Sequence, residues 1–228
     1  MKEEKNYNKR TEKDYGFWRK LFYRAFVIFV VVPVSKLMYN LKIEGKENVP
    51  KSSRIIYAAN HVSYLDPPFV SYAVWKYVAY MAKQELFQDK AKKLLFFLVH
   101  TLGAFAVNRE KPEIATFKTV KAVFNTPWSL GIFPQGGIRK EPEISNIHKG
   151  FVIFAKKFQA DIVPVGICGF TGYAKKLFEK NMTVKVGKPI SYTLEEDEII
   201  KEWARQICEM TGFENKIEEK QKELVHNS

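Results

Sequence analysis

Residues 55–67 read IIYAANHVSYLDP, and this stretch decides how the middle of the chain folds. Its first part, Ile55–Ala59, is a short apolar run with the length and composition of a buried strand. Polar residues follow, and Asp66 and Pro67 favour the start of a helix. The stretch therefore predicts a strand that turns into a helix. His61 and Asp66 would lie at the carboxyl end of that strand, where α/β folds place their sites.

The same alternation of short apolar runs and helical patterns continues along the chain. It predicts a single α/β domain with a largely parallel or mixed central sheet flanked by helices. The expected strands are Ile55–Ala59, Val78–Met81, Ala104–Val107, Leu130–Phe133, Ile162–Val165 and Thr183–Val186, and the expected helices are Phe69–Lys76, Lys90–Thr101, Pro112–Phe124, Gly150–Phe158 and Glu196–Met210.

The N-terminal segment Phe17–Tyr39 combines aromatic and cationic residues with an apolar run. As a helix, the uncharged part Ala25–Ser35 would span only about 16 Å of a hydrocarbon core of about 30 Å, and Pro33 should kink or break it. We therefore expect two short amphipathic helices that lie at a membrane interface. A single spanning helix, with Arg24 and Lys36 reaching the head groups, and a buried helix pair are the alternatives.

The expected organisation has three parts. Residues 1–44 would form a polar tail, over residues 1–14, and the N-terminal membrane-associating helices. Residues 45–212 would form the α/β domain. Residues 213–228 would form a polar C-terminal tail.

Composition excludes several classes of protein. The chain has 228 residues, of which 46% are hydrophobic and 27% charged, so it can bury a core and is not disordered. Two cysteines, Cys168 and Cys208, exclude a disulfide framework and a four-cysteine zinc module. No stretch of about 18 residues is free of charge, which excludes a multispanning membrane protein.

The charge is unevenly distributed. The formal net charge is +12, but ten acidic and five basic residues occur from Glu195 onward, so residues 1–194 carry +17. A basic body predicts an anionic partner: nucleic acid, anionic lipid head groups or a phosphorylated substrate. The sequence shows no recognition motif for nucleic acid, so we expect no nucleic-acid partner.

The pair His61 and Asp66 has the residue types of a general base and the group that orients it. Imidazole accepts a proton near neutral pH, and a carboxylate bonded to Nδ1 leaves Nε2 as the acceptor. Taken alone, the pair has a simpler interpretation, in which Asp66 caps the next helix and His61 packs.

Four sequence motifs that occur in a particular order favour the catalytic interpretation of His61 and Asp66. Asn60-His61-Val62-Ser63-Tyr64-Leu65-Asp66 resembles the first motif of the glycerolipid acyltransferases, specifically the 1-acyl-sn-glycerol-3-phosphate acyltransferase (lysophosphatidic acid acyltransferase) family. The stretches that resemble its later motifs are Gly103–Arg109, Phe133–Arg139 and Ile162–Val165. The resemblance covers about residues 45–190, so it implies an acyltransferase domain within residues 45–212.

The resemblance implies transfer of an acyl group from a thioester to a hydroxyl. His61 would act as general base and Asp66 would orient it. The backbone amides of Gly136 and Gly137 would stabilise the oxyanion. Arg109 and Arg139 would bind the acceptor's phosphate. Gln135, Gly136, Gly137 and Lys140 are the other expected substrate-binding residues. No metal site, cofactor or thiol nucleophile is expected.

The third block departs from the family's usual Phe-Pro-Glu-Gly-Thr-Arg-Ser. Gln135 stands in place of the glutamate, Gly137 in place of the threonine, and Ile138 in the arginine column. Arg139 follows one place later. A one-residue slip in the glycine-rich turn, the use of Lys140, or a different acyl acceptor would each account for the change, and the three alternatives stay open.

The expected function is acyl transfer from acyl-CoA or acyl carrier protein to 1-acylglycerol-3-phosphate, which gives phosphatidic acid, on the cytoplasmic face of a membrane with an anionic surface. The alternatives are another lysolipid or glycerol-3-phosphate as acceptor, or a non-catalytic protein that binds anionic lipids.

Overall fold

The computed structural model describes residues 9–83, 99–107, 114–169 and 181–217. Within them lies a seven-stranded sheet of order β1-β8-β7-β2-β5-β3-β4. All neighbouring strands in it are parallel except β7 and β8. The strands are β1 (Lys42–Glu44), β2 (Ile55–Ala59), β3 (Tyr77–Lys83), β4 (Phe105–Val107), β5 (Trp128–Ile132), β7 (Asp161–Cys168) and β8 (Thr183–Val186). The prediction of a largely parallel α/β sheet is confirmed.

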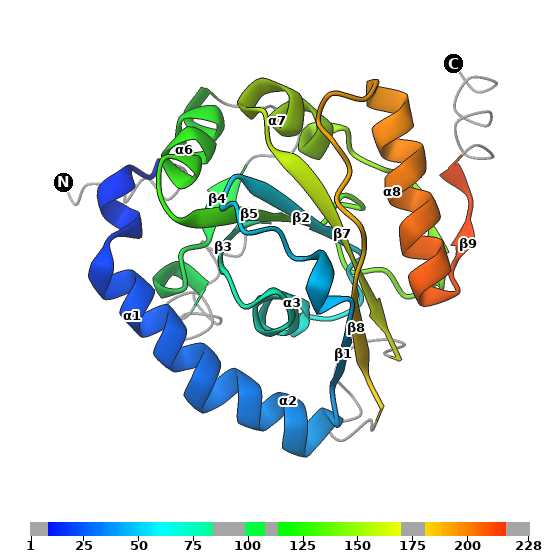
Figure 1. Ribbon diagram of the computed structural model, residues 1–228, viewed down its shortest axis with the longest axis horizontal. Coiled ribbons are helices and arrows are strands. Elements are labelled where there is room, and N and C mark those ends of the chain that lie inside the picture. The colour runs from blue at the N-terminus through cyan, green and yellow to red at the C-terminus, as the bar shows by residue number, and fades with distance from the viewer. Residues whose placement is uncertain (1–8, 84–98, 108–113, 170–180, 218–228) are drawn as a thin grey trace.

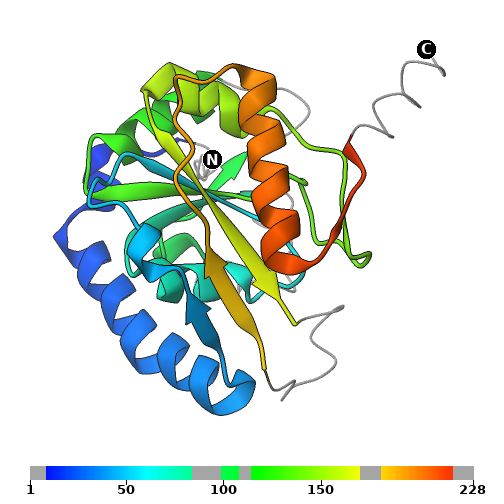
Figure 2. The ribbon, with the colours of Figure 1, turned by 45° about the vertical axis from the view of Figure 1, so that its right-hand side comes forward.

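Helices cover both faces of this sheet (Figures 1 and 2). Helix α3 (Asp66–Val74) lies on one face, and α6 (Ile114–Phe124), α7 (Gly150–Phe158) and α8 (Glu196–Thr211) lie on the other. Strand β2 is buried on both sides, since Ile55 and Tyr57 pack into the core beneath α3 while Ile56 and Ala58 pack beneath α7 and α8. This accounts for the continuous apolar run that predicted it.

Most predicted elements occur within a few residues of their expected ends, and α7 and β8 have the expected bounds. The helix expected over Lys90–Thr101 lies mostly outside the described residues. Short strand β1 was not predicted. Strands β6 (Glu143–Ile144) and β9 (Glu214–Asn215), which form a separate parallel pair, were not predicted either. Because of this pair, the segment expected to be a C-terminal tail begins inside the fold.

The N-terminal segment forms one continuous helix, so the prediction of two helices is wrong. Helix α1 (Phe17–Phe26) continues through a π-helical turn, η2 (Val27–Val31), into α2 (Val32–Tyr39). In the wider turn the N–H of Val32 donates to the carbonyl of Val27, five residues back. A π-turn just before Pro33 rearranges the hydrogen bonds that proline would otherwise disrupt, and the helix therefore continues through it.

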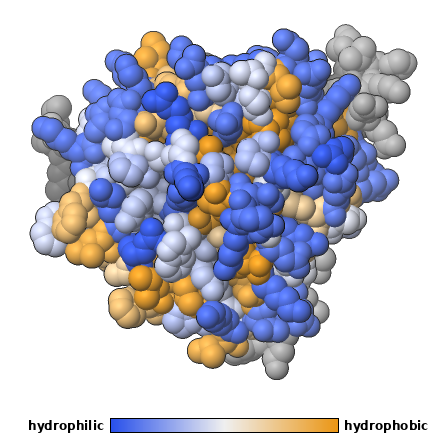
Figure 3. Space-filling view, viewed as in Figure 1, coloured by the Kyte–Doolittle hydropathy of each residue, from blue (hydrophilic) through white to orange (hydrophobic). Residues whose placement is uncertain are grey.

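One side of this helix packs against the domain and the other is exposed and apolar. Tyr23, Val27, Val31, Ser35 and Tyr39 are buried at intervals of four residues. The large exposed residues are Phe17, Trp18, Leu21, Phe22, Ile28, Phe29, Val30 and Leu37, and we call this set the outer face of the N-terminal helix. Hydrophobic side chains gather along the edge of the molecule where α1 and α2 lie (Figure 3).

By length and composition alone this helix could cross a membrane. Its 23 residues contain an 18-residue window of mean hydropathy 1.8, of which 22% is buried inside the protein.

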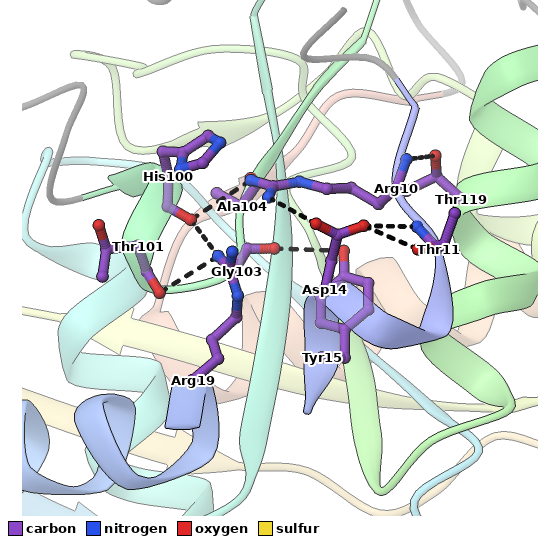
Figure 4. Close-up of polar contacts among 10 residues, drawn as sticks. All are labelled: Arg10, Thr11, Asp14, Tyr15, Arg19, His100, Thr101, Gly103, Ala104 and Thr119. Atoms are coloured by element: carbon purple, nitrogen blue, oxygen red, sulfur yellow. Dashed lines mark hydrogen bonds and ion pairs between the residues drawn. The ribbon is translucent and has the colours of Figure 1, made fainter. Parts of the chain in front are cut away.

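Part of the segment expected to be a solvated tail is buried. Arg10 is only 5% exposed. Its guanidinium donates to the carbonyls of Ala104 (2.7 Å) and His100 (3.3 Å) and lies 3.8 Å from Asp14 (Figure 4). Its backbone N–H donates to the hydroxyl of Thr119. These partners offset the cost of burying a charge, which is why a polar segment lies against the domain.

Candidate active site

The turn between β2 and α3 brings His61 and Asp66 together. Asp66 is fully buried, and its Oδ2 accepts hydrogen bonds from His61 Nδ1 (2.7 Å) and from the backbone N–H groups of Val62 (2.7 Å) and Ser63 (2.8 Å). The carboxylate therefore bonds to the loop that precedes the helix. It does not cap α3, whose N-cap residue is Leu65.

The hydrogen bonds to Asp66 indicate which nitrogen of the His61 ring faces the carboxylate. Burial raises the pKa of the Asp66 carboxyl above its ordinary value, and the hydrogen bonds from His61 and the two amides partly offset this. Three donors converge on Oδ2, so the Nδ1 of His61 carries its hydrogen toward Asp66. In the neutral ring Nε2 is then the nitrogen that accepts a proton. The other carboxylate oxygen, Oδ1, is buried and has no hydrogen-bond partner.

Aromatic stacking fixes the plane of the His61 ring. Phe133 follows β5, the parallel neighbour of β2, so the two residues meet at the same edge of the sheet. Their ring centroids are 4.0 Å apart with an interplanar angle of 20°. Tyr80 stacks on Phe133 in turn, and its hydroxyl donates to the carbonyl of Pro67 at the start of α3. The side chain of His61 is 15% exposed, so part of the ring remains open to a ligand.

Asn60 has a role that the sequence analysis did not assign. Its fully buried side chain donates to the carbonyl of Ile167 (3.0 Å) and accepts from the same residue's N–H (2.7 Å). This pair ties the end of β2 to the neighbouring strand β7, and therefore positions the turn that carries His61. The only signal in the sequence was its place at the start of the first block.

The third block passes directly alongside His61. The backbone N–H of Arg139 donates to the carbonyl of His61 (2.8 Å), and the Arg139 guanidinium donates to the carbonyl of Gln135 (2.8 Å). The Nε of Arg139 is buried and has no hydrogen-bond partner. The loop thus carries Arg139 next to the His61–Asp66 turn, while the side chain of Lys140 is exposed.

Gln135, Gly136 and Gly137 differ in the contacts that they make. The Gln135 side chain is buried and donates to the carbonyl of Glu143, so it holds the loop together. Gly136 adopts a left-handed φ of 73°, and its N–H already donates to the carbonyl of Phe133 (2.9 Å). At Gly137 a Cβ would meet nothing within 4 Å, so open space surrounds this residue.

The second block is held by the N-terminal segment, as Figure 4 shows. The guanidinium of Arg19 donates to the carbonyls of His100 and Thr101, and the hydroxyl of Tyr15 donates to the carbonyl of Gly103 (3.3 Å). These bonds, with those of Arg10, position the turn that enters β4. The predicted phosphate ligand Arg109 follows β4 and lies outside the described residues.

An apolar cavity of about 260 Å³ adjoins His61, and we call it the His61 cavity. The N-terminal helix contributes Tyr23, Val27 and Val31 to its wall, and α3 contributes Pro68 among other residues. The ring of His61 lies in this wall, so the cavity and the His61–Asp66 pair form one site.

Among the described residues, no group of three or more His, Cys, Asp or Glu side chains could hold a metal ion. Burial raises the pKa of the Cys168 and Cys208 thiols, which disfavours the thiolate.

Comparisons with known proteins identify the family of this chain. A family model described as Acyltransferase matches residues 40–168. The chain is 31% identical over 159 residues to a 1-acyl-sn-glycerol-3-phosphate acyltransferase of Bacillus subtilis, which covers 69% of this chain and 77% of that protein. It is 27% identical over 161 residues to a protein of the same name from Borreliella burgdorferi, which covers 68% of this chain and 63% of that protein.

The fold also resembles a solved structure. The 1-acyl-sn-glycerophosphate (LPA) acyltransferase PlsC from Thermotoga maritima matches with a TM-score of 0.64 at 21% identity, over 84% of this chain and 80% of that one. The family match spans more than half of the sequence and includes the turn with His61 and Asp66 and the loop with Arg139. The chain therefore belongs to the acyltransferase family of enzymes.

Proposed function

We propose that this acyltransferase moves a fatty acyl group from an acyl thioester to the free hydroxyl of 1-acylglycerol-3-phosphate, giving phosphatidic acid. The observation that carries the proposal is the buried Asp66 carboxylate 2.7 Å from His61 Nδ1, with the ring in the wall of an apolar cavity. The relatives from Bacillus subtilis and Borreliella burgdorferi are named for this acceptor, which supports the choice.

His61 acts as general base in this mechanism. Its Nε2 takes the proton of the acceptor hydroxyl as the hydroxyl oxygen attacks the thioester carbonyl. Asp66 holds the ring and stabilises the imidazolium that forms. Collapse of the tetrahedral intermediate breaks the C–S bond, and the imidazolium returns its proton to the leaving thiolate. No covalent acyl-enzyme is required.

The oxyanion of the intermediate needs a hydrogen-bond donor. Because the N–H of Gly136 is already bonded to the carbonyl of Phe133, we assign this role to the backbone N–H of Gly137. Open space around Gly137 lets a substrate carbonyl approach its backbone closely.

The acyl group fits the His61 cavity. Its walls are mostly apolar, and His61 lies at one side. A fatty acyl chain is uncharged along its length and gains about 0.8 kcal/mol for each CH₂ group that it buries. With the chain in this cavity, its carbonyl carbon would lie beside the imidazole.

The acceptor's phosphate is assigned to Arg139 together with Arg109. Arg139 is partly buried, its backbone is bonded to His61, and its Nε has no partner within the protein. A guanidinium can bind a phosphate through two parallel hydrogen bonds. Arg139 would then replace the arginine that the family has one residue earlier, at the position of Ile138. Lys140 is the alternative cation.

We predict that Arg139→Ala raises the KM for 1-acylglycerol-3-phosphate and costs about 1.5–3 kcal/mol of transition-state binding, the range for a hydrogen bond to a charged group. The KM for the donor should stay the same. Steady-state kinetics with each substrate varied in turn measures both values. Arg109→Ala should act on the same parameter, and the double variant should be non-additive if both residues bind one phosphate.

Two controls accompany this measurement. With monoacylglycerol, which has no phosphate, wild type and Arg139→Ala should have equal rates. Lys140→Ala should leave the acceptor KM unchanged. If Lys140→Ala raises it and Arg139→Ala does not, the slip is wrong and Lys140 binds the phosphate.

We further propose that the outer face of the N-terminal helix rests on the cytoplasmic leaflet of an anionic membrane. Lys20 follows two of its exposed aromatic residues, Phe17 and Trp18, in the sequence, and aromatic and basic residues together favour the membrane interface. Arg19 and Arg24 instead contact the domain. The opposite side of the helix is buried against the domain. A helix packed in this way lies along the protein surface, so the proposal is monotopic association.

Phe29→Glu and Leu37→Glu should each weaken binding to vesicles that contain anionic lipid, by roughly tenfold or more, because each removes one large apolar side chain from the interface. Phe29 is 77% exposed and Leu37 is 84% exposed, so neither change disturbs the core. Deleting the helix would be less informative, since its inner side belongs to the core. Flotation with vesicles measures the binding.

Ile114→Glu is the matched control, since Ile114 is 75% exposed on α6 and lies outside the N-terminal helix. It should bind vesicles as wild type does. Equal flotation of Phe29→Glu, Leu37→Glu and wild type would show that the membrane contact lies elsewhere.

The proposed function itself is tested by a matrix of donors and acceptors with the purified full chain. Release of thiol from palmitoyl-CoA or palmitoyl-carrier protein should depend on added 1-acylglycerol-3-phosphate. Equal or greater transfer to glycerol-3-phosphate or another lysolipid would reassign the acceptor.

A further inference from the structure

A second apolar cavity, of about 280 Å³, lies between α6, α7 and the loop after β5, and we call it the α6–α7 cavity. It shares Phe133 and Met81 with the His61 cavity. The two cavities thus adjoin at the carboxyl ends of β3 and β5. Since His61 stacks on Phe133, the reacting atoms lie close to the wall between the two cavities.

One residue that lines the α6–α7 cavity has a buried hydroxyl without a hydrogen-bond partner. Thr116 lines it and is only 4% exposed, and its hydroxyl has no hydrogen-bond partner. A buried hydroxyl without a partner is costly, and such groups are rare in folded proteins. A ligand that supplies a polar atom inside this cavity would remove that cost.

The rest of the cavity wall has an aromatic part and a part with ionisable side chains. Phe117, Phe151 and Phe154 supply aromatic walls. Among the described residues, the ionisable side chains of the lining are His148 and Lys149. The Lys149 side chain is 54% exposed, and its Nζ lies 3.4 Å from Oδ1 of Asp197, which is 78% exposed. This exposed ion pair is weak, so the phosphate of a ligand can compete with Asp197 for Lys149. A ligand that fits has apolar segments, an internal hydrogen-bonding group and an anionic end.

We propose that the α6–α7 cavity binds the phosphopantetheine arm of the acyl donor. The arm is a narrow chain of methylene and methyl groups interrupted by two amides, and it ends in a phosphate. Its apolar segments match the aromatic walls, an amide can pair with Thr116, and its phosphate can reach Lys149. Coenzyme A and acyl carrier protein carry the same arm, so the site serves either donor.

The arrangement of the two cavities matches the connectivity of a thioester. In the donor, the acyl chain, the carbonyl, the sulfur and the arm follow one another along a single chain. An acyl chain in the His61 cavity and an arm in the α6–α7 cavity place the carbonyl at the shared wall, beside His61. The fatty chain of the acceptor fits less well, because it would leave the Thr116 hydroxyl unpaired.

This inference rests on the proposed function and is tested with two variants and three donors. Thr116→Val removes the hydroxyl and keeps the shape of the side chain. Ile153→Trp enlarges a side chain that lines the cavity and is 43% exposed, so the fold tolerates it. Ile114→Trp, on the exposed side of α6, is the matched control. The donors are palmitoyl-CoA, palmitoyl-carrier protein and the palmitoyl thioester of ethanethiol, which has no arm.

We expect Thr116→Val to raise the KM for the donor that carries the arm by roughly 2- to 12-fold, as loss of one hydrogen bond predicts. Ile153→Trp should raise it by about tenfold or more, because the larger side chain occupies the space of the arm. With the ethanethiol thioester, both variants should match wild type. Acceptor KM should not change, and Ile114→Trp should match wild type throughout. The donor that wild type turns over identifies the natural source of the arm.

Two results would overturn the inference while leaving acyl transfer in place. One is an unchanged KM for both arm-bearing donors in Thr116→Val and Ile153→Trp. The other is an equal loss with the ethanethiol thioester. Failure of wild type to transfer from any donor would refute the proposed function itself, and this inference with it. Thr116→Val should unfold at the same or a higher temperature than wild type, since it removes an unpaired buried hydroxyl.

Discussion

Replacing His61 with alanine should lower kcat by roughly 10²–10⁴-fold or more while the protein stays folded, because the variant loses the proposed general base. His61 lies in a turn and its ring is partly exposed, so its removal leaves the sheet and helices intact. The measurement is thiol release with 1-acylglycerol-3-phosphate present, together with circular dichroism and thermal unfolding of the same sample.

His61→Gln separates proton transfer from hydrogen bonding. Its amide can still donate to Asp66, but it cannot accept a proton from the acceptor hydroxyl. We therefore expect the glutamine variant to be about as inactive as the alanine variant, with unchanged binding of the lysolipid. Near-wild-type turnover in either variant would rule out His61 as the general base.

Asp66→Asn should also have a severe effect, with a loss of roughly 10²–10⁴-fold in kcat, because a neutral amide cannot stabilise the imidazolium. The turn itself should survive. The amide oxygen can take the place of Oδ2 and accept from Val62 and Ser63, and the NH₂ group then occupies the position of Oδ1, which has no partner.

The matched control for this change is Asp161→Asn. Asp161 lies at the start of β7 and accepts a backbone hydrogen bond from Tyr192 (3.2 Å), far along the sheet from the carboxyl end of β2. It should retain wild-type kcat. If Asp66→Asn and Asp161→Asn have similar small effects, the carboxylate of Asp66 does not assist His61.

The strands and most helices were predictable because their signals are local. Ile55–Ala59 and Thr183–Val186 are short apolar or alternating runs bounded by polar residues, and both are strands with those bounds. The same stretch placed His61 and Asp66 at the end of a strand. Their spacing is short, so the turn alone brings them together.

The N-terminal helix could not be predicted from the same local rules. Pro33 indicated a kink or a break, but the helix continues past it through a π-helical turn. Packing of Val27 and Val31 in the core stabilises that turn. Arg10 looked like a solvated charge because its partners, Ala104 and His100, are about ninety residues away in the sequence. Contacts between residues so far apart in the sequence cannot be predicted from the composition of a short segment.

The third block shows a similar limit at the site. The sequence located the loop but did not indicate which contacts its side chains and amides make. The structure shows that the Gln135 side chain donates to the carbonyl of Glu143 and that the N–H of Gly136 donates to the carbonyl of Phe133. The N–H of Arg139 donates to the carbonyl of His61.

The central position of β2 has a consequence for the dynamics of the site. Strand β2 is hydrogen-bonded on both edges, by β5 and by β7, and covered on both faces. Backbone amides in such a strand exchange with solvent only through the largest openings of a protein, with a free energy close to that of global unfolding. The amides of Val62 and Ser63, bonded to buried Asp66, continue this protected region into the turn. The outer strands β1 and β4 can open by local fluctuations while the His61–Asp66 pair remains assembled, so hydrogen exchange should find these two loop amides among the slowest in the domain.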